Sequence, residues 1–165
     1  MKLHSRQNFT LNGTVDENQT RIFFKQPITI KPNSHLEVYW VNIEYEPTAD
    51  YLTEGVDVLC DLPIKTFVNY VDSTPKNLAG VELPVIISIP PTTQAQLNAD
   101  DPTTLPDIAV ITREPFTPII HQLDNNEQQI NSITFTFHDR FNDRRPVDEV
   151  DLFQISFAII ENPLE

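Results

Sequence analysis

Histidine and carboxylate side chains are the groups best suited to catalysis or metal binding, and in this chain they are widely spaced. The histidines are His4, His35, His121 and His138, and none of them falls in a metal-ligand spacing such as His-x-x-x-His. A folded sandwich could still bring them together. The pattern favours solvent-facing or strand-edge histidines, and it favours a strand end with a turn at His138-Asp139.

The segment Asp139–Pro146 offers oxygen ligands suited to calcium, at Asp139, Asn142 and Asp143. It lacks the Asp-x-Asp-x-Asp-Gly spacing and the closing Glu of a calcium loop. Three arginines compete for the same carboxylates: Arg140, Arg144 and Arg145. We therefore expect a salt-bridged surface loop, and we predict no metal site and no cofactor.

Cys60 is the only cysteine, so it cannot form an intramolecular disulfide. A nucleophilic thiol needs a nearby base and a lowered pKa, and the sequence around Cys60 shows neither. Alternation in Val56–Asp61 makes it a small core residue instead. Phosphate-cradling loops are also missing from the sequence, because its only glycines are Gly13, Gly55 and Gly80. We assign no catalytic residue and predict that the protein is not an enzyme.

Aromatic side chains suggest one binding function that stays open. Tyr39, Trp40, Tyr45 and Tyr51 could form a platform for sugars, because aromatic rings stack on the apolar faces of sugars. Their positions in alternating segments favour core and sheet-edge roles. A carbohydrate- or receptor-binding module that also uses the surface loop Pro90–Pro106 remains the alternative.

The charge excludes one class of partner. With 24 acidic and 11 basic residues the net charge is −13, which repels phosphate backbones, so we expect no direct nucleic-acid binding. The charge could instead complement a basic partner, as in an acidic chaperone, although the carboxylates are scattered rather than gathered in a tail. No apolar stretch approaches the roughly 20 residues that cross a bilayer, so we expect no membrane span.

Two segments near the C-terminus alternate apolar and polar residues with the period of a half-buried strand. Asn131–His138 has the apolar row Ile133, Phe135 and Phe137. Val150–Ile160 has the apolar row Phe153, Ile155, Phe157 and Ile159. The pattern predicts a pair of neighbouring antiparallel strands that line a core.

Turn and strand signals divide the first half of the chain. Asn12-Gly13 predicts a turn, and a short strand at Ile22-Phe23-Phe24 is expected to end before Pro27. Pro32-Asn33-Ser34 predicts a turn into Leu36–Tyr45, whose two apolar rows indicate a strand covered on both sides. Further strands are expected at Val56–Cys60, Phe67–Val71, Leu83–Ile89, Ile108–Ile111 and Phe116–Leu123.

These segments amount to eight to ten short strands with no amphipathic helix, which favours an all-β protein built as a β-sandwich or jelly roll. The 165 residues suit one domain, so we expect residues 1–165 to form it and residues 1–20 to be an extended N-terminal arm. Fourteen prolines against three glycines favour long, stiff connections over tight hairpin turns.

Several segments resemble a viral family in their order. Val58–Leu62 looks like its strand ending in a small residue and Asp, Leu83–Pro90 like its strand closing on Ile-Pro, and Ile130–Arg140 and Val147–Ile159 like its last two strands. Phe116–Ile120 is similar to the segment before that hairpin. From Gly55 onward the chain thus resembles the single jelly-roll virion proteins, pentons and minor capsid proteins, of virophages, polinton-like viruses and large eukaryotic DNA viruses.

The resemblance implies a single jelly-roll fold and a structural role in a virion. It implies partners of two kinds, namely further copies of the same chain in a pentamer or trimer and other capsid proteins. It also implies synthesis in the cytoplasm of a host cell and a final location in the capsid. Within the same family, the receptor-binding alternative would correspond to the head of a virion spike.

Overall fold

The structure, a computed structural model, describes residues 5–46, 55–65, 68–69, 82–83, 85–90, 108–139, 147 and 150–162. These residues contain eleven strands and no helix, so the all-β expectation is confirmed. The strands are β1 (Arg6–Thr14), β2 (Gln19–Ile30), β3 (Ser34–Tyr45), β4 (Val56–Cys60), β5 (Val68–Asn69), β6 (Glu82–Leu83), β7 (Val85–Ile89), β8 (Ala109–Arg113), β9 (Ile119–Gln122), β10 (Gln128–Asp139) and β11 (Val150–Glu161).

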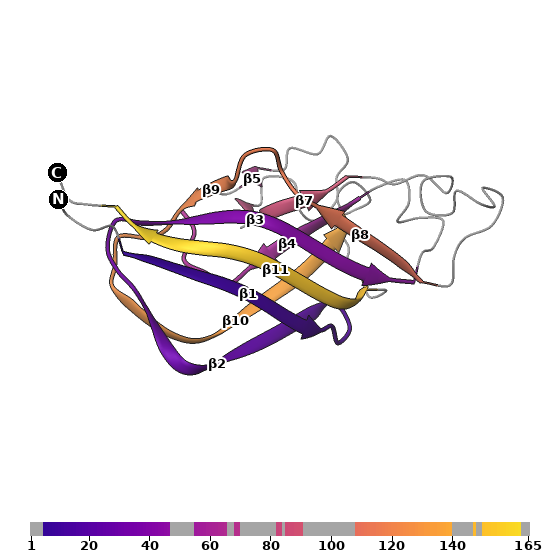
Figure 1. The fold of residues 1–165 in the computed structure, drawn as a ribbon, viewed down its shortest axis with the longest axis horizontal. Coiled ribbons are helices and arrows are strands. Elements are labelled where there is room, and N and C mark those ends of the chain that lie inside the picture. The colour runs from indigo at the N-terminus through magenta and orange to yellow at the C-terminus, as the bar shows by residue number, and fades with distance from the viewer. Residues whose placement is uncertain are drawn as a thin grey trace.

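Two antiparallel sheets pack face to face as a jelly-roll sandwich (Figure 1). The first sheet has the order β1-β11-β3-β8, and β9 pairs with the part of β3 that β8 leaves free. The second sheet has the order β2-β10-β4-β7. Strands that follow one another in sequence mostly lie in opposite sheets, which is why one chain can build both layers and the core between them. A short separate ladder joins β5 and β6.

The predicted pairing of the last two strands is wrong. β10 pairs with β2 and β4 in the second sheet, whereas β11 pairs with β1 and β3 in the first. The two strands face each other across the sandwich, where the Phe153 ring lies 4.9 Å from Phe135 and 5.1 Å from Phe137 between centroids. Alternation shows which face of a strand is buried, but two strands can share a core without sharing a ladder.

The predicted apolar rows of those strands are confirmed. Ile133, Phe135, Phe137, Phe153, Ile155 and Phe157 are at most 1% exposed. Burial of each such side chain contributes roughly 1.5–3 kcal/mol relative to exposure in water. These rows are therefore the centre of the core.

β3 has one buried face rather than the two that were predicted. Trp40 is paired with Ser156 and Val38 with Phe157, so Tyr39 is an extra residue in the ladder. This β-bulge changes the phase of alternation, and Val38 before it and Ile43 after it both point into the same core. The two apolar rows of the sequence are one row interrupted by a bulge.

The predicted turn at Asn12-Gly13 is also wrong, because both residues lie inside β1. The chain turns instead between Asp16 and Gln19, where Glu17 adopts a positive φ of 55°. Gly13 is needed for packing, since a Cβ atom there would collide with the side chain of Thr20 on β2.

β2 continues through Pro27, where the sequence predicted its end. Its pairing with β10 is irregular between Phe23 and Ile28, so the missing N–H of proline falls in a stretch without a regular ladder. The predicted turn before β3 is confirmed, with Asn33 at φ 61° and the Ser34 hydroxyl donating to the Lys31 carbonyl oxygen at 2.7 Å.

Several predictions fall outside the described residues. They include most of the strand Phe67–Val71 and nearly all of the loop Pro90–Pro106. His4, Tyr51 and two residues of the expected salt-bridged loop, Asn142 and Asp143, also lie there. Within the described part of the chain, no helix has the length and apolar character needed to cross a membrane.

Candidate interaction surfaces

The sandwich has two lateral margins that differ in chemistry. We call the side formed by β1 and β2 the hairpin margin. We call the side formed by Ile108, β8, β9 and residues 114–118 the β8–β9 margin. The two margins lie on opposite sides of the molecule (Figure 1). β1 and β2 are the edge strands of the two sheets on one side, and β8 and β9 lie at the opposite edge of the first sheet.

The β8–β9 margin carries exposed apolar side chains. Among the described residues, six large hydrophobic side chains are exposed, and four of them are here: Ile108 (54%), Val110 (59%), Phe116 (104%) and Ile120 (58%). Val110 pairs with Glu44 and Ile120 with Glu37, so these side chains are spread along the length of β3. Several exposed apolar side chains on one margin are typical of interaction sites in soluble proteins. Among the described residues, β8 and β9 pair with β3 alone, so within this part of the chain the margin is also a sheet edge.

Sequence reasoning misplaced Phe116. The sequence predicts a strand over Phe116–Leu123, but β9 begins only at Ile119, and Phe116 lies in the link between β8 and β9. Pro115 and Pro118 flank it, and proline cannot donate to a ladder. The two prolines were the sequence signal that this aromatic residue does not belong to a strand.

Inside the same margin, a buried histidine links the two sheets. His121 is 9% exposed, and its Nε2 lies 2.7 Å from the carbonyl oxygen of Ile86 on β7. His121 lies on the edge strand β9, but it does not face solvent, because it pairs with Leu36 and shares its inward face. Of the two expectations for the histidines, solvent-facing or strand-edge, the solvent-facing one is wrong here. Burial lowers the pKa of His121, and the hydrogen bond to Ile86 opposes that effect. The neutral ring therefore donates through Nε2 to the carbonyl.

The hairpin margin carries a groove of about 560 Å³ between β1 and β2. It is lined by Asn12, Gly13, Thr14, Asp16, Gln19, Thr20, Arg21, Ile22 and Phe23. Phe23 is 69% exposed, and the guanidinium carbon of Arg21 lies 5.0 Å from its ring centroid. Arg21 Nε also donates to Ser132 Oγ at 3.0 Å, which holds the guanidinium over the ring.

The outward face of the first sheet carries a polar network near the start of β1 and β3. The Tyr39 hydroxyl donates to Glu37 Oε2 at 2.7 Å, and His35 Nε2 lies 3.2 Å from Glu37 Oε1. Arg6 donates to the Tyr39 hydroxyl, and its guanidinium carbon lies 5.5 Å from that ring. The pKa of Glu37 is lowered, and the largest cause is the hydrogen bond from Tyr39. The charges of His35 and Arg6 lower this pKa further, and burial opposes these effects. This network ties β1 to β3 across β11.

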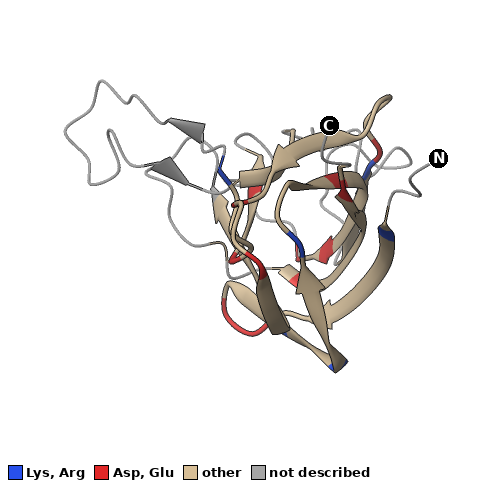
Figure 2. Cartoon of the chain, turned by 90° about the vertical axis from the view of Figure 1, so that its left-hand side faces the viewer, with Lys and Arg blue, Asp and Glu red and all other residues tan. Residues whose placement is uncertain are grey.

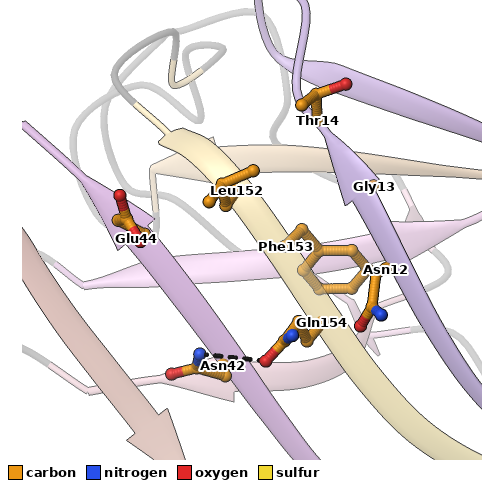
Figure 3. A pocket seen from close by; sticks show the side chains of 8 residues that line it. All are labelled: Asn12, Gly13, Thr14, Asn42, Glu44, Leu152, Phe153 and Gln154. Atoms are coloured by element: carbon orange, nitrogen blue, oxygen red, sulfur yellow. Dashed lines mark hydrogen bonds between the residues drawn. The ribbon is translucent and has the colours of Figure 1, made fainter.

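Further along that face, a shallow depression of about 320 Å³ lies over β1, β11 and β3 (Figure 3). Thr112 Oγ1 donates to Asn42 Oδ1 at 2.8 Å, and Asn42 Nδ2 donates to Gln154 Oε1 at 3.3 Å. Leu152 and the carboxylate of Glu44 also line it. Amide, carboxylate and apolar groups on one surface are suited to a neutral polar ligand.

The four aromatic residues considered for a sugar platform do not share one surface. Tyr45 is 5% exposed and points into the core, where burial raises its pKa to about 12. Tyr39 belongs to the polar network, and Trp40 is half-buried beside it at the bulge. Tyr51 lies outside the described residues.

Residues considered for catalysis are built into the fold. Cys60 is 3% exposed, as predicted for a core residue, and burial raises the pKa of its thiol to about 12. A carboxylate that the sequence analysis did not single out, Asp57, is also buried, at 1% exposure, and accepts a hydrogen bond from Ser88 Oγ at 2.6 Å. β10 ends at Asp139, as expected. Among the described residues no group of three His, Cys, Asp or Glu side chains could hold a metal ion.

Acidic residues lie on both sheets and in the connections of the described chain, and basic residues are fewer (Figure 2). Three exposed cations follow the hairpin margin along β2 and just beyond it, at Arg21, Lys25 and Lys31. The β8–β9 margin has an exposed carboxylate at Glu114 beside Phe116. The margins therefore differ in charge as well as in polarity.

No protein-family model matches the sequence, and no curated protein matches it significantly. The fold is similar to the solved structure of the mavirus penton protein, with a TM-score of 0.55 and 9% identity over 93% of this chain and 99% of that one.

Weaker similarity is found to the infectious bursal disease virus Gx strain (TM-score 0.31, 10% identity, 98% of this chain and 33% of that one) and to the VP2 subviral particle of that virus (0.32, 11%, 95% and 32%). At 9% identity the likeness to the penton protein is one of fold. The chain has the jelly-roll architecture of a viral penton protein.

Proposed function

We propose that this protein is a structural component of a virion capsid, of the penton or minor capsid type, that acts by associating with copies of itself and with other capsid proteins. One observation carries the proposal: a chain with the fold of a penton protein exposes four large apolar side chains along a single sheet margin. A free apolar edge in a soluble protein invites uncontrolled pairing unless a partner covers it.

The remaining features fit the same role. The catalytic candidates Cys60 and His121 are buried in the sandwich, so the proposal assigns them to stability and gives the protein no enzymatic function. The proposal places the protein in the virion after synthesis in the host cytoplasm, with residues 1–165 as one jelly-roll domain. It includes no nucleic-acid partner, because the net charge of −13 repels phosphate.

Light scattering after size-exclusion chromatography tests the proposal, with negative-stain images of any oligomer. A closed pentameric ring supports a penton, and a trimer supports a minor capsid protein or spike. Measurements at low and high salt are informative, because salt screens the repulsion between copies that each carry a net charge of −13. A monomer at high micromolar concentration in both salts would contradict self-association.

The depression over β1, β11 and β3 favours a second candidate function, binding of a neutral carbohydrate or a receptor, as in a spike head. The fixed amides of Asn42 and Gln154 and the carboxylate of Glu44 could accept and donate hydrogen bonds to sugar hydroxyls. Saturable binding of a neutral oligosaccharide that Asn42→Ala abolishes would support it. Equal binding by wild type and Asn42→Ala would count against it.

A further inference from the structure

We propose that the β8–β9 margin of one copy docks onto the hairpin margin of a second copy, with Phe116 and Glu114 of the first against Phe23 and Arg21 of the second. This inference rests on the proposed function and names the two surfaces that would meet. It makes the contact head-to-tail, with a different surface from each copy.

The first argument is exposure. Phe116 is 104% exposed and Phe23 is 69% exposed, although both are large aromatic side chains on an otherwise well-buried sandwich. Each lies at a sandwich margin, and the two margins are opposite. A contact that covers both at once must therefore join two molecules.

The second argument is charge. The hairpin margin offers the exposed cations Arg21 and, further along β2, Lys25, together with the exposed carboxylates of Asp16 and Glu17 at its turn. Arg21 lies over Phe23, so it is the charge placed to pair with Glu114 when Phe116 meets Phe23. Complementary charge selects the partner surface and its register, although an exposed pair adds only about 1 kcal/mol or less to affinity.

The third argument is spacing. Glu114 and Phe116 are two residues apart and both exposed, and Arg21 and Phe23 on β2 have the same spacing and exposure. When the two segments run in the same direction, an aromatic pair and a Glu–Arg pair can form together. Aromatic pairs add about 0.5–1.5 kcal/mol beyond the area that they bury.

The backbone around Phe116 favours side-chain docking over strand addition. Pro115 and Pro118 remove two ladder donors from the link between β8 and β9. On the other copy, the groove of about 560 Å³ beside Arg21 and Phe23 has room for an inserted side chain. The geometry therefore makes Phe116 a projecting residue and the hairpin margin its receptor.

A contact between two different surfaces repeats from copy to copy, and it closes into a ring when the rotation between neighbours allows it. Two full-length variants test this. The knob variant combines Glu114→Arg with Phe116→Ser, and the groove variant combines Arg21→Glu with Phe23→Ser. All four residues are exposed, so both variants should stay folded. The groove variant should unfold at a slightly lower urea concentration than wild type, because it loses the hydrogen bond from Arg21 to Ser132.

We expect each variant alone to be monomeric under conditions in which wild type is oligomeric. Mixed in equal amounts, they should form mainly a heterodimer, because the knob variant keeps an intact hairpin margin and the groove variant keeps an intact β8–β9 margin. The two surfaces left free carry a swapped charge pair but have lost both phenylalanines, so larger species should be few. Combining Glu114→Arg with Arg21→Glu in one chain should restore part of the association. Asp151→Arg, an exposed charge change on β11 in the interior of the first sheet, is the matched control and should stay oligomeric.

The outcomes separate the two proposals. If wild type and both variants form the same oligomer, the docking surfaces are wrong while self-association stands. If the knob variant is monomeric but the groove variant is not, the contact joins two β8–β9 margins and the head-to-tail arrangement is wrong. A monomeric wild type overturns both.

Discussion

Two phenylalanines show how differently apolar residues are used in this molecule. Phe153 is 0% exposed and packs against Phe135 and Phe137 from the opposite sheet. Phe116 is 104% exposed and lies between two prolines at the β8–β9 margin. The first stabilises the sandwich, and the second contributes no comparable burial to it. Residues such as Phe116 therefore need another reason to be apolar, and association supplies one.

The contrast between Phe153 and Phe116 predicts its largest loss of stability in the core. Replacing Phe153 with Ala removes the ring that joins the two sheets and should reduce the free energy of unfolding by about 3–5 kcal/mol. Leu152→Ala, at the neighbouring residue that is 42% exposed, is the control and should change it by about 0.5 kcal/mol or less. Urea denaturation of both variants measures the difference, and equal losses would show that Phe153 is not central to the core.

The hairpin margin contains one residue that should behave like the core. Gly13→Ala places a methyl group against the side chain of Thr20, and such overpacking typically costs about 1–3 kcal/mol. Thr20→Ala in the same chain should recover part of that loss, because it removes the colliding oxygen. A double-mutant cycle from thermal unfolding measures the coupling, and strictly additive effects would contradict the close packing.

The free energy of unfolding should depend on pH through His121, which lies in the β8–β9 margin. Burial lowers the pKa of His121 in the folded state, so the unfolded chain binds its proton more readily. This contribution to stability is intact above the unfolded pKa, roughly 6.5, and is lost as the pH falls from there through the lowered folded pKa.

His121→Gln keeps a donor for the Ile86 carbonyl without a titrating ring. Denaturation midpoints of wild type should therefore fall between pH 7.5 and 5.5 more than those of His121→Gln. Parallel pH dependence of the two proteins would show that the buried imidazole does not control stability in this range.

The smallest change in stability should accompany the largest change in association. Phe116→Ser should alter the free energy of unfolding by about 0.5 kcal/mol or less, since the side chain is fully exposed. The same variant should lower the weight-average mass of the oligomer. A large loss of stability in a sample kept monomeric by dilution would show that Phe116 stabilises the fold as Phe153 does, and the contrast between the two residues would be wrong.

Alternation predicts the buried rows of the long strands β10 and β11 well, because each turns one row of apolar residues to the core. In β4 every residue is buried, so alternation does not distinguish its two faces. The rows of β10 and β11 are correct in every residue tested, from Ile133 to Phe157. Pairing is a different property. It depends on long connections that carry the chain from one sheet to the other, and the local sequence around Phe135 or Phe153 contains no signal for it.

Local irregularities explain the other differences. The extra residue at Tyr39 gives the sequence of β3 two apolar rows, although the strand has one buried face. Gly13 resembles a turn residue in the sequence, because the side chain that it packs against, Thr20, lies on another strand. The candidate interaction surface was equally hidden. Phe116 is apolar like a core residue, and only the fold shows that it lies outside the core.

The central claim, self-association through the margins of a jelly roll, is tested most directly by the equilibrium mass of the full chain. Sedimentation equilibrium over micromolar to high micromolar concentrations, at low and high salt, should give a mass that reaches a fixed multiple of 18.9 kDa and no more. The plateau should come at lower protein concentration in high salt, because screening weakens the repulsion between acidic copies. A mass of 18.9 kDa at every concentration and in both salts would contradict the account.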